Sequence, residues 1–241
     1  MAAGATIIQA WPEDLSAFEN PVWSALTAGP HRDWAGRFSD TAWYPGAVAP
    51  FVAIPHHDVV PHLDEARERG MGTQAYFVGV LPRELPRGWR VTAYSFILQL
   101  FPTEATWAEA EEAGVVLEET HRPAMRSLMQ AAFPDYFRER TAELGTYVGV
   151  FEGRRLIAMA GERIAIPGWQ EVSAVCTHPD FARRGHARRL TLAVMVHQRR
   201  RGTGSFLHTS EGNIAGRALY RSMHFVERAP IAHIKVERAA S

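Results

Sequence analysis

The sequence predicts an α/β protein with a mixed, mostly antiparallel sheet flanked by helices, preceded by a smaller α/β N-terminal half-domain. Three observations predict this fold class. Strand-like and helix-like segments alternate along the second half of the chain. An apolar content of 46% against 22% charged residues, in 241 residues, is typical of a globular chain with a sizeable core. The character of the sequence also changes near residue 112, since five of the seven Trp precede Trp107.

The first region, residues 1–112, combines turn-rich stretches with a few short elements. We expect helices near 21–26 and 60–69, a strand near 49–54, and two further strands over 74–80 and 90–101. The glycine-rich stretch RGMGTQA at 69–75 leads into a strand rather than a helix. It therefore does not predict a phosphate-binding loop in this region.

The second region, residues 113–241, has a more regular pattern. A strand at 115–119 precedes a helix over 120–133, whose apolar residues recur on one face. A hairpin over 146–166 turns at Glu152-Gly153, and a strand follows at 170–177. We then expect a helix from Gly185 through Arg201, a strand at 204–210, a helix after Asn213 and a closing strand at 231–237.

Bulk properties exclude several classes of protein. Equal numbers of basic and acidic residues, 26 each, argue against a general nucleic-acid binder. The N-terminal stretch lacks the basic start of a signal peptide, and no apolar run reaches the length of a membrane span. The single Cys176 excludes an internal disulfide and a cysteine-built zinc site. We expect a cytoplasmic protein without membrane or nucleic-acid partners, monomeric or homodimeric.

The stretch CTHPDFARRGHARRLTLAV, residues 176–194, indicates an anion site. A strand ends, a short loop with Gly185 follows, and a helix begins, so unpaired N–H groups and the positive end of the helix dipole meet there. Arg183, Arg184 and Arg188 add positive charge. Taken alone, the same pattern also fits a solvated basic helix face.

Two motifs in this region resemble the GNAT superfamily of acetyl-CoA-dependent N-acetyltransferases. The segment from Ala182 to Ala187 fits the family pattern Gln/Arg-x-x-Gly-x-Gly/Ala, except that Ala182 replaces the leading Gln or Arg. The segment NIAGRALYRSMHF fits Asn-x-x-Ala/Gly-x-x-Leu-Tyr followed by Gly-Phe, except that His224 replaces the glycine. The similarity covers about 115–236, and the first region loosely resembles a degenerate half-GNAT unit.

The resemblance implies acetyl-CoA as co-substrate and assigns residues to it. Loop amides would grip the pyrophosphate, the end of the preceding strand would pair with the pantetheine arm, and the asparagine would reach it. The residues so implied are Val175, Cys176, Thr177, Arg183, Arg184, Gly185, His186, Ala187, Arg188 and Asn213. No metal is expected.

Two side chains are candidates for acid–base catalysis. Tyr220 would face the thioester sulfur as an acid, although a core tyrosine with a bonded hydroxyl is the alternative. Glu171 would be the base, with a pKa raised by partial burial, although a solvent-facing strand glutamate is equally compatible. Glu162 is the reserve base. Cys176 has no recognisable His/Asp partner, so a covalent acetyl-cysteine is disfavoured.

Two further groups of residues bear on the acceptor. His56, His57, Asp58 and His62 could ligate a metal, but their spacing favours a loop, and a wall of the acceptor pocket is the better functional reading. Aromatic residues of the first region could line the same pocket or simply pack in the core: Trp23, Trp34, Trp43, Tyr44 and Phe51.

The leading hypothesis is an N-acetyltransferase that moves an acyl group from CoA to a small amine or amino acid by direct transfer. A non-catalytic acyl-CoA-binding or regulatory module on the same fold is the alternative. An O-acyltransferase or acyl-amino-acid synthase is a third reading, since fold alone does not choose among them.

Overall fold

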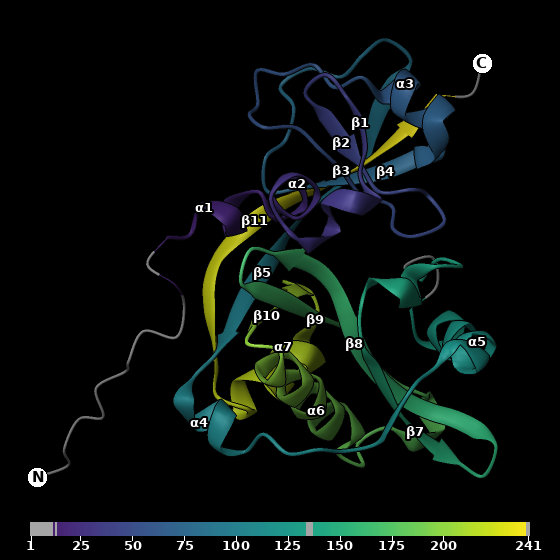
Figure 1. The fold of residues 1–241 in the computed structure, drawn as a ribbon, viewed down its shortest axis with the longest axis vertical. Helices are drawn as coiled ribbons and strands as arrows, with labels where there is room; N and C mark the ends of the chain where they lie inside the picture. Colours follow the sequence, from purple (N-terminus) through teal and green to yellow (C-terminus); the bar gives the residue numbers. More distant parts are fainter. Residues whose placement is uncertain (1–11, 13, 134–136, 240–241) are drawn as a thin grey trace, which may run out of the picture.

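A computed structural model of the protein shows an eight-stranded sheet and a separate three-stranded sheet (Figure 1). It describes residues 12, 14–133 and 137–239. Most of the N-terminal stretch, which we expect not to be a signal peptide, therefore lies outside the described residues. The strands of the large sheet lie in the order β4 (Gln74–Val78), β11 (Phe225–Arg238), β5 (Trp89–Pro102), β10 (Gly204–Ser210), β9 (Trp169–Thr177), β8 (Arg155–Ile166), β7 (Tyr147–Glu152), β6 (Val115–Val116).

The predicted mixed, mostly antiparallel sheet is confirmed. Strands β9 and β10 pair in parallel, and the other neighbouring pairs of the large sheet are antiparallel. The hairpin of β7 and β8 turns where the sequence predicts, because Gly153 adopts a φ of 58° that glycine tolerates without strain.

The large sheet runs across the predicted division at residue 112. Strand β5 comes from the first region, yet it lies between β10 and β11 of the second region. Both β5 and β11 are long and extend through the two parts of the molecule that Figure 1 shows above and below. The division into two domains stays a prediction, and the hydrogen-bonded sheet crosses it.

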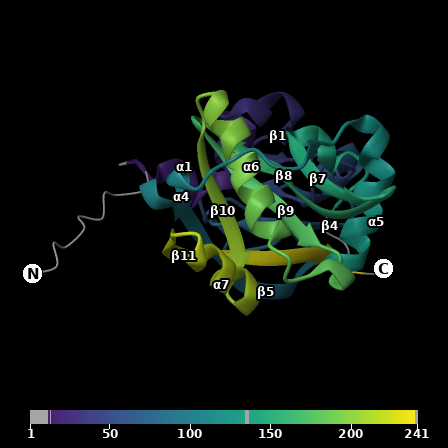
Figure 2. The same cartoon turned by 90° about the horizontal axis from the view of Figure 1, so that it is seen from below.

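Helices cover both faces of the sheet around β8 and β9. Helix α6 (His186–Arg200) packs its buried Leu190 and Val194 against Ala158 and Ala160 of β8 (Figure 2). Helix α5 (Arg122–Ala132) packs on the opposite face against Met159 and Cys176. Helix α7 (Ile214–Ser222) contacts β11, and the short α4 (Glu104–Ala108) contacts β5. The one-face stripe predicted for α5 is confirmed, since its Met125, Leu128 and Met129 are buried.

The first region is less regular than the sequence predicts. It holds α1 (Ser16–Glu19), α2 (Pro21–Thr27), a 3-10 turn η1 (Pro30–Trp34) and the small sheet of β1 (Gly36–Phe38), β2 (Thr41–Trp43) and β3 (Val52–Ala53). The strand expected over 49–54 is only two residues long, and the helix expected over 60–69 is replaced by α3 (Leu63–Ala66) and a π-helical turn, η2 (Arg67–Met71). Pro61 and a left-handed Gly70 bound that segment, which shortens it.

Three 3-10 turns complete the second region: η3 (Glu119–His121), η4 (Thr141–Leu144) and η5 (Pro179–Phe181). The strand predicted at 115–119 is limited to β6, because the chain turns into η3 after Leu117. The closing strand predicted over 231–237 instead begins at Phe225, with a register shift between Glu227 and Pro230. Among the described residues, no helix is long and apolar enough to span a membrane.

Candidate active site

Strands β9 and β10 separate where the candidate site begins. Their parallel pairing runs from Gly204–Trp169 to Leu207–Val172 and then stops, although β9 continues to Thr177 and β10 to Ser210. The edge of β9 that faces the gap therefore carries backbone groups without a strand partner there. An extended ligand arm could add to such an edge by main-chain hydrogen bonds.

A bulge in β9 lies at the same place. Two steps along β8, from Met159 to Gly161, match three steps along β9, from Cys176 to Ser173. Within the bulge, Ala174 has a φ of 51°, a conformation that L-residues rarely adopt. The bulge breaks strand alternation, so the consecutive residues 172–175 all line one cavity.

The loop after β9 presents backbone N–H groups at the start of α6. Gly185 is the left-handed N-cap residue, with a φ of 77°, and Arg183 is also left-handed, with a φ of 61°. The first α6 hydrogen bond at this end runs from Arg189 N–H to Gly185 O, so the amides of residues 186–188 precede it. A Cβ built on Gly185 would meet no atom within 4 Å, so the space above this glycine is open. These features suit an anion.

The loop arginines differ in their partners. Arg188 pairs with Glu109 and donates to the carbonyl of Ser222 at 3.2 Å, so only its backbone amide is available to the anion site. Arg184 stacks over Phe181 at 5.0 Å, and Arg183 is exposed. The three arginine side chains therefore surround the loop but do not all point toward one position.

Helix α7 begins on Asn213 as predicted. The Asn213 side chain accepts a hydrogen bond from Gly216 N–H at 2.9 Å and donates to Thr209 Oγ1 at 3.2 Å. Gly216 is required by this cap, because a Cβ there would lie 2.4 Å from Asn213 Nδ2. At the other end, His224 adopts a left-handed conformation with a φ of 60°, which the glycine of the GNAT motif pattern would adopt more readily.

Tyr220 lies on α7 and lines the cavity with a buried ring. Burial raises the pKa of its phenol well above the ordinary value, so the group stays protonated. Among the described residues its hydroxyl has no hydrogen-bond partner, and the ring packs edge-on to Phe225. By contrast, the buried hydroxyls of Tyr44 and Tyr147 are bonded to His31 Nδ1 and Glu162 O. Tyr220 therefore differs from the alternative, a core tyrosine whose hydroxyl is hydrogen-bonded.

Cys176 is a buried strand residue that packs with α5. Burial raises the pKa of its thiol to about 12, so almost no thiolate is present at neutral pH. We expect the native protein to resist alkylation by iodoacetamide at pH 7.5, and the denatured protein to react fully. Mass spectrometry of both samples checks this, and rapid modification of the native thiol would contradict the burial.

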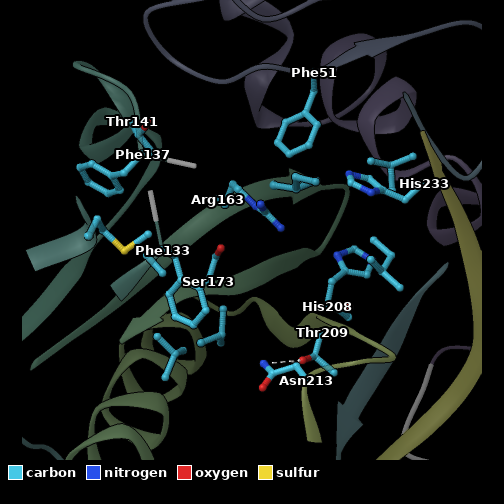
Figure 3. A pocket seen from close by; sticks show the side chains of 18 of the residues that line it. Phe51, Phe133, Phe137, Thr141, Arg163, Ser173, His208, Thr209, Asn213 and His233 are labelled. Carbon is cyan, nitrogen blue, oxygen red and sulfur yellow. Dashed lines mark hydrogen bonds between the residues drawn. The ribbon is translucent and has the colours of Figure 1, made fainter. Parts of the chain in front are cut away.

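A cavity of about 360 Å³ connects these elements. Its walls come from both regions of the chain, since Phe51, Val78, Ser95 and Ile97 precede residue 112. In Figure 3, Phe51 lies above Arg163 and Phe137 lies to its left, whereas Thr209 and Asn213 lie below it. The remaining lining residues are Met129, Phe133, Thr141, Tyr147, Ile164, Val172, Ser173, Ala174, Val175, His208, Ser210, Tyr220 and His233. The volume is near the lower end for small-molecule sites.

Glu171 lies behind this cavity in a tight charge pair. Its carboxylate accepts two hydrogen bonds from Arg163, at 2.9 and 2.6 Å, and one from the Ile164 amide at 3.2 Å. Its side chain is 0% exposed. Burial alone would raise its pKa, but Arg163 and His208 outweigh burial and hold the pKa far below the ordinary value. The expected raised pKa is therefore wrong, because sequence did not reveal the arginine beside it.

A polar chain extends from Glu171 to the surface. Arg228 donates to Gln99 Oε1 at 2.7 Å, which turns the Gln99 amide nitrogen toward His208 Nε2 at 3.1 Å. His208 Nε2 must then accept, so His208 Nδ1 carries the proton and donates to Glu171 Oε1 at 2.8 Å. Sequence reasoning did not identify Arg163, His208 or His233 as site residues. They lie on different strands, and only the pairing of the sheet brings them to the same cavity.

His233 forms another polar wall of the cavity. It stacks on Tyr76 with ring centroids 5.0 Å apart, and its Nδ1 lies 3.1 Å from Ser95 Oγ. Burial, followed by the charge of Arg163, lowers the pKa of His233 to about 4. The imidazole is therefore neutral at physiological pH.

The other predicted candidates lie away from the cavity. Glu162 accepts from Thr146 N–H at 2.6 Å and pairs with Arg201. Asp58 pairs with Arg83 at 2.5 Å, and the His56–His62 stretch contributes no residue to the lining. Of the five aromatic residues proposed for the acceptor pocket, Phe51 alone lines it. Among the described residues, no group of three or more His, Cys, Asp or Glu side chains could hold a metal.

Comparisons with known proteins identify the fold. Residues 147–233 match the model of the FR47-like protein family. A Novosphingobium aromaticivorans protein assigned to the GNAT family of acetyltransferases superposes with a TM-score of 0.76 at 28% identity, covering 92% of this chain and 99% of that one. A GCN5-related N-acetyltransferase from Kribbella flavida gives 0.58 at 12% identity, covering 94% and 96%. No curated protein matches the chain. The resemblance to the GNAT superfamily is confirmed, and the fold is one that supports acyl transfer.

Proposed function

On the premise of this GNAT fold, we propose that the protein is an acetyl-CoA-dependent N-acyltransferase that acts on a small amine by direct transfer. The observation that carries the proposal is the convergence of three features on one cavity: the unpaired edge of β9, the capped start of α7 and the unbonded Tyr220 hydroxyl. The N-terminal region would shape the acceptor side, since Phe51, Val78, Ser95 and Ile97 lie in the wall.

The residues present fit CoA. The amides at the start of α6, with the open space above Gly185, suit a pyrophosphate. The β9 edge from Val175 to Thr177 suits the amide groups of a pantetheine arm, and Asn213 lies beside it. Acetyl-CoA would supply an acetyl thioester there.

In the proposed reaction a C–N bond forms between the amine and the acyl carbon, and the C–S bond breaks. The proton lost by nitrogen goes to solvent or to the departing sulfur. The Tyr220 hydroxyl donates a hydrogen bond to that sulfur. Complete transfer of its proton is not required, because a thiolate with an ordinary pKa of about 8.5 is a far weaker base than the Tyr220 phenolate.

Glu171 has a positioning role in this proposal rather than that of a direct base. Its carboxylate is held ionised by Arg163, so it has little tendency to take a proton from an amine. It fixes the Arg163 guanidinium and the His208 ring against the cavity. His233 also lines the cavity, but its lowered pKa disfavours the protonated form, so the amine proton goes to solvent or to the departing sulfur.

A screen for CoA release against amines, amino acids and alcohols tests the function. The expected result is thiol release that depends on an amine, with an acetylated amine identified by product mass. Calorimetric binding of CoA without release across the panel would instead support the non-catalytic module. An acetylated hydroxyl would support an O-acyltransferase.

Replacing Gly185 by Val should weaken CoA binding more than Arg183→Ala does. A β-branched residue at a φ of 77° is strained, which would displace the amides at the start of α6. We expect about a tenfold or greater rise in Kd for Gly185→Val and about a twofold to threefold rise for Arg183→Ala. Calorimetric titration with CoA measures both. The opposite ranking would mean that side-chain charge, not the loop backbone, holds the ligand.

A further inference from the structure

A second open strand edge, that of β5, faces the gap beside β9. The pairing of β10 with β5 ends at Ser210 and Ile97, although β5 extends back to Trp89. Among the described residues, no strand continues along that edge of β5. Residues 90–96 are all exposed, and Tyr94 is 59% exposed. The edge is therefore accessible to a ligand.

The main-chain groups of Tyr94 point into this gap. Ala232 of β11, which lies opposite Phe96, accepts a hydrogen bond from Gly79 N–H at 2.8 Å, so its main chain faces β4 and not β5. On the other side, Phe96 O accepts from Glu211 N–H at 3.5 Å, so the main chain of Phe96 faces β10. Alternate residues of a strand direct N–H and C=O toward the same edge, so those of Tyr94 face the gap as well.

The two open edges border the same cavity. Residues 172–175 of β9 line one side of it, and Ser95 of β5 lines the other. In Figure 3, Ser173 lies on the left and His233, the β11 residue paired with Ser95, lies on the right, with Asn213 below both. A ligand that pairs with β5 would therefore lie beside a pantetheine arm that pairs with β9.

Strand direction determines which end of a paired peptide reaches the acyl group. Strand β10 is antiparallel to β5 and ends at Ser210, close to Asn213 of the proposed CoA side. A peptide that continues the line of β10 along β5 has the same direction as β10. Its N-terminus then lies nearest Ser210, and its later residues lead away from the CoA side. The amine that the proposed reaction requires is at the correct end.

We propose that the acceptor is a short peptide, about three residues long, that adds to the free edge of β5 as an antiparallel strand and presents its N-terminal amine to the acyl group. This inference rests on the proposed function. The first peptide residue lies opposite Ser95. The second lies opposite Tyr94 and exchanges two main-chain hydrogen bonds with it. A bulge in β5 between Ala93 and Val91 ends the regular edge and limits the length of the peptide.

The side chains of such a peptide would alternate between two walls. The first and third would point, like Ser95, to the face where His233 lies. The second would point to the face of Tyr94 and Phe96, whose ring centroids are 5.3 Å apart and whose rings are exposed. Because aromatic cross-strand pairs stabilise antiparallel sheets, an aromatic second residue is preferred. Transfer forms a C–N bond at the N-terminal amine and breaks the C–S bond; one proton leaves nitrogen, and CoA leaves as the thiol.

Methylation of the peptide backbone tests the pairing. Ala-Phe-Ala is compared, in a CoA-release assay, with two analogues that are N-methylated at the second or at the third residue. The first analogue lacks the N–H that donates to Tyr94 O, so its kcat/KM should be at least about tenfold lower. The third residue directs its N–H away from β5, so its methylation should change kcat/KM less than about twofold. Equal effects of both methyl groups, or no effect of either, would overturn the strand pairing.

A variant of the chain tests the same contact from the protein side. Tyr94→Pro removes the N–H that faces the gap, and Tyr94→Ala, the matched control, removes the ring but keeps that N–H. The sheet should tolerate the proline, because this N–H does not bond to β11. We expect kcat/KM for Ala-Phe-Ala to be at least about tenfold lower in Tyr94→Pro than in Tyr94→Ala. Equal values in the two folded variants would contradict the proposal, and the methylated peptides test it with the wild-type chain.

Binding measurements separate this inference from the proposed function. Calorimetry uses the full chain with CoA present, and Ala-Phe-Ala should bind at least about tenfold more tightly than the analogue methylated at the second residue. That selective binding without thiol release would overturn the function and support the pairing. Thiol release with phenethylamine but not with Ala-Phe-Ala would support the function and overturn the peptide acceptor. A dimer in analytical ultracentrifugation that Tyr94→Pro dissociates and Ala-Phe-Ala does not would assign the edge to a second copy of the chain instead.

Discussion

Tyr220→Phe should lower kcat about 100-fold and leave the Kd for acetyl-CoA within about twofold. The substitution removes a single hydroxyl that has no partner among the described residues, so the buried ring and its contact with Phe225 remain. What is lost is the hydrogen bond proposed to reach the departing sulfur. Steady-state turnover and calorimetric titration separate the two effects.

Tyr44→Phe is the matched control for this experiment. The Tyr44 ring is also buried, but its hydroxyl is bonded to His31 Nδ1 at 2.8 Å and lies outside the cavity lining. We expect this variant to lose about 1 kcal/mol of stability and to keep its turnover. Equal turnover in Tyr220→Phe and wild type would remove Tyr220 from the mechanism. A shared loss in both variants would point to general disturbance of the fold.

Glu171→Gln should destabilise the protein by about 3–5 kcal/mol, which corresponds to a fall in melting temperature of about 10 °C. The neutral amide removes the carboxylate charge that faces Arg163 and has one oxygen where the carboxylate has two. Thermal denaturation at pH 7 measures the loss. Replacing an exposed partner instead, as in Asp58→Asn beside Arg83, should cost less than about 1 kcal/mol.

The same pair determines how stability depends on acidity. The pKa of Glu171 is depressed in the folded state, so its contribution is full above the ordinary glutamate value of about 4.3 and is lost as pH falls below it. The difference in free energy of unfolding between wild type and Glu171→Gln should therefore shrink as pH falls below about 4.3. This difference in free energy of unfolding should be constant from pH 5 to 8. If it instead shrinks as pH rises through 6, the pKa of Glu171 is raised in the folded protein.

Local patterns made the second region predictable. The apolar stripe of α5, the turn at Gly153 and the cap at Asn213 each depend on residues a few positions apart, and each lies where the sequence predicts it. The start of α6 at Gly185 belongs to the same group. Short-range geometry fixes these features whatever lies around them.

Long-range pairing accounts for what the sequence did not show. His208 is 37 positions from Glu171 and 109 from Gln99, and nothing near any of them in the sequence predicts their contact. Arg163 is only eight positions from Glu171, but it reverses the expected direction of the Glu171 pKa because the pairing of β8 with β9 brings the two side chains together. Of the residues implied by the GNAT resemblance, Val175 and Asn213 line the cavity and 183–188 lie at the start of α6, whereas Cys176 packs against α5. The identity of a base depends on contacts between strands, which the motifs do not contain.

The order of strands also constrains how the chain assembles. Strands β4 and β5 are neighbours in sequence, yet β11 lies between them in the sheet. During synthesis, residues 74–102 must therefore wait for residues 225–238 before either strand has its full set of partners. Contacts with such long sequence separation slow folding, and the unpaired strands are exposed to aggregation during the delay. Without the β11 residues, β4 and β5 would have no strand to connect them in the sheet. The cavity wall would then lose its arrangement, because Val78 lies on β4 and Ser95 and Ile97 lie on β5.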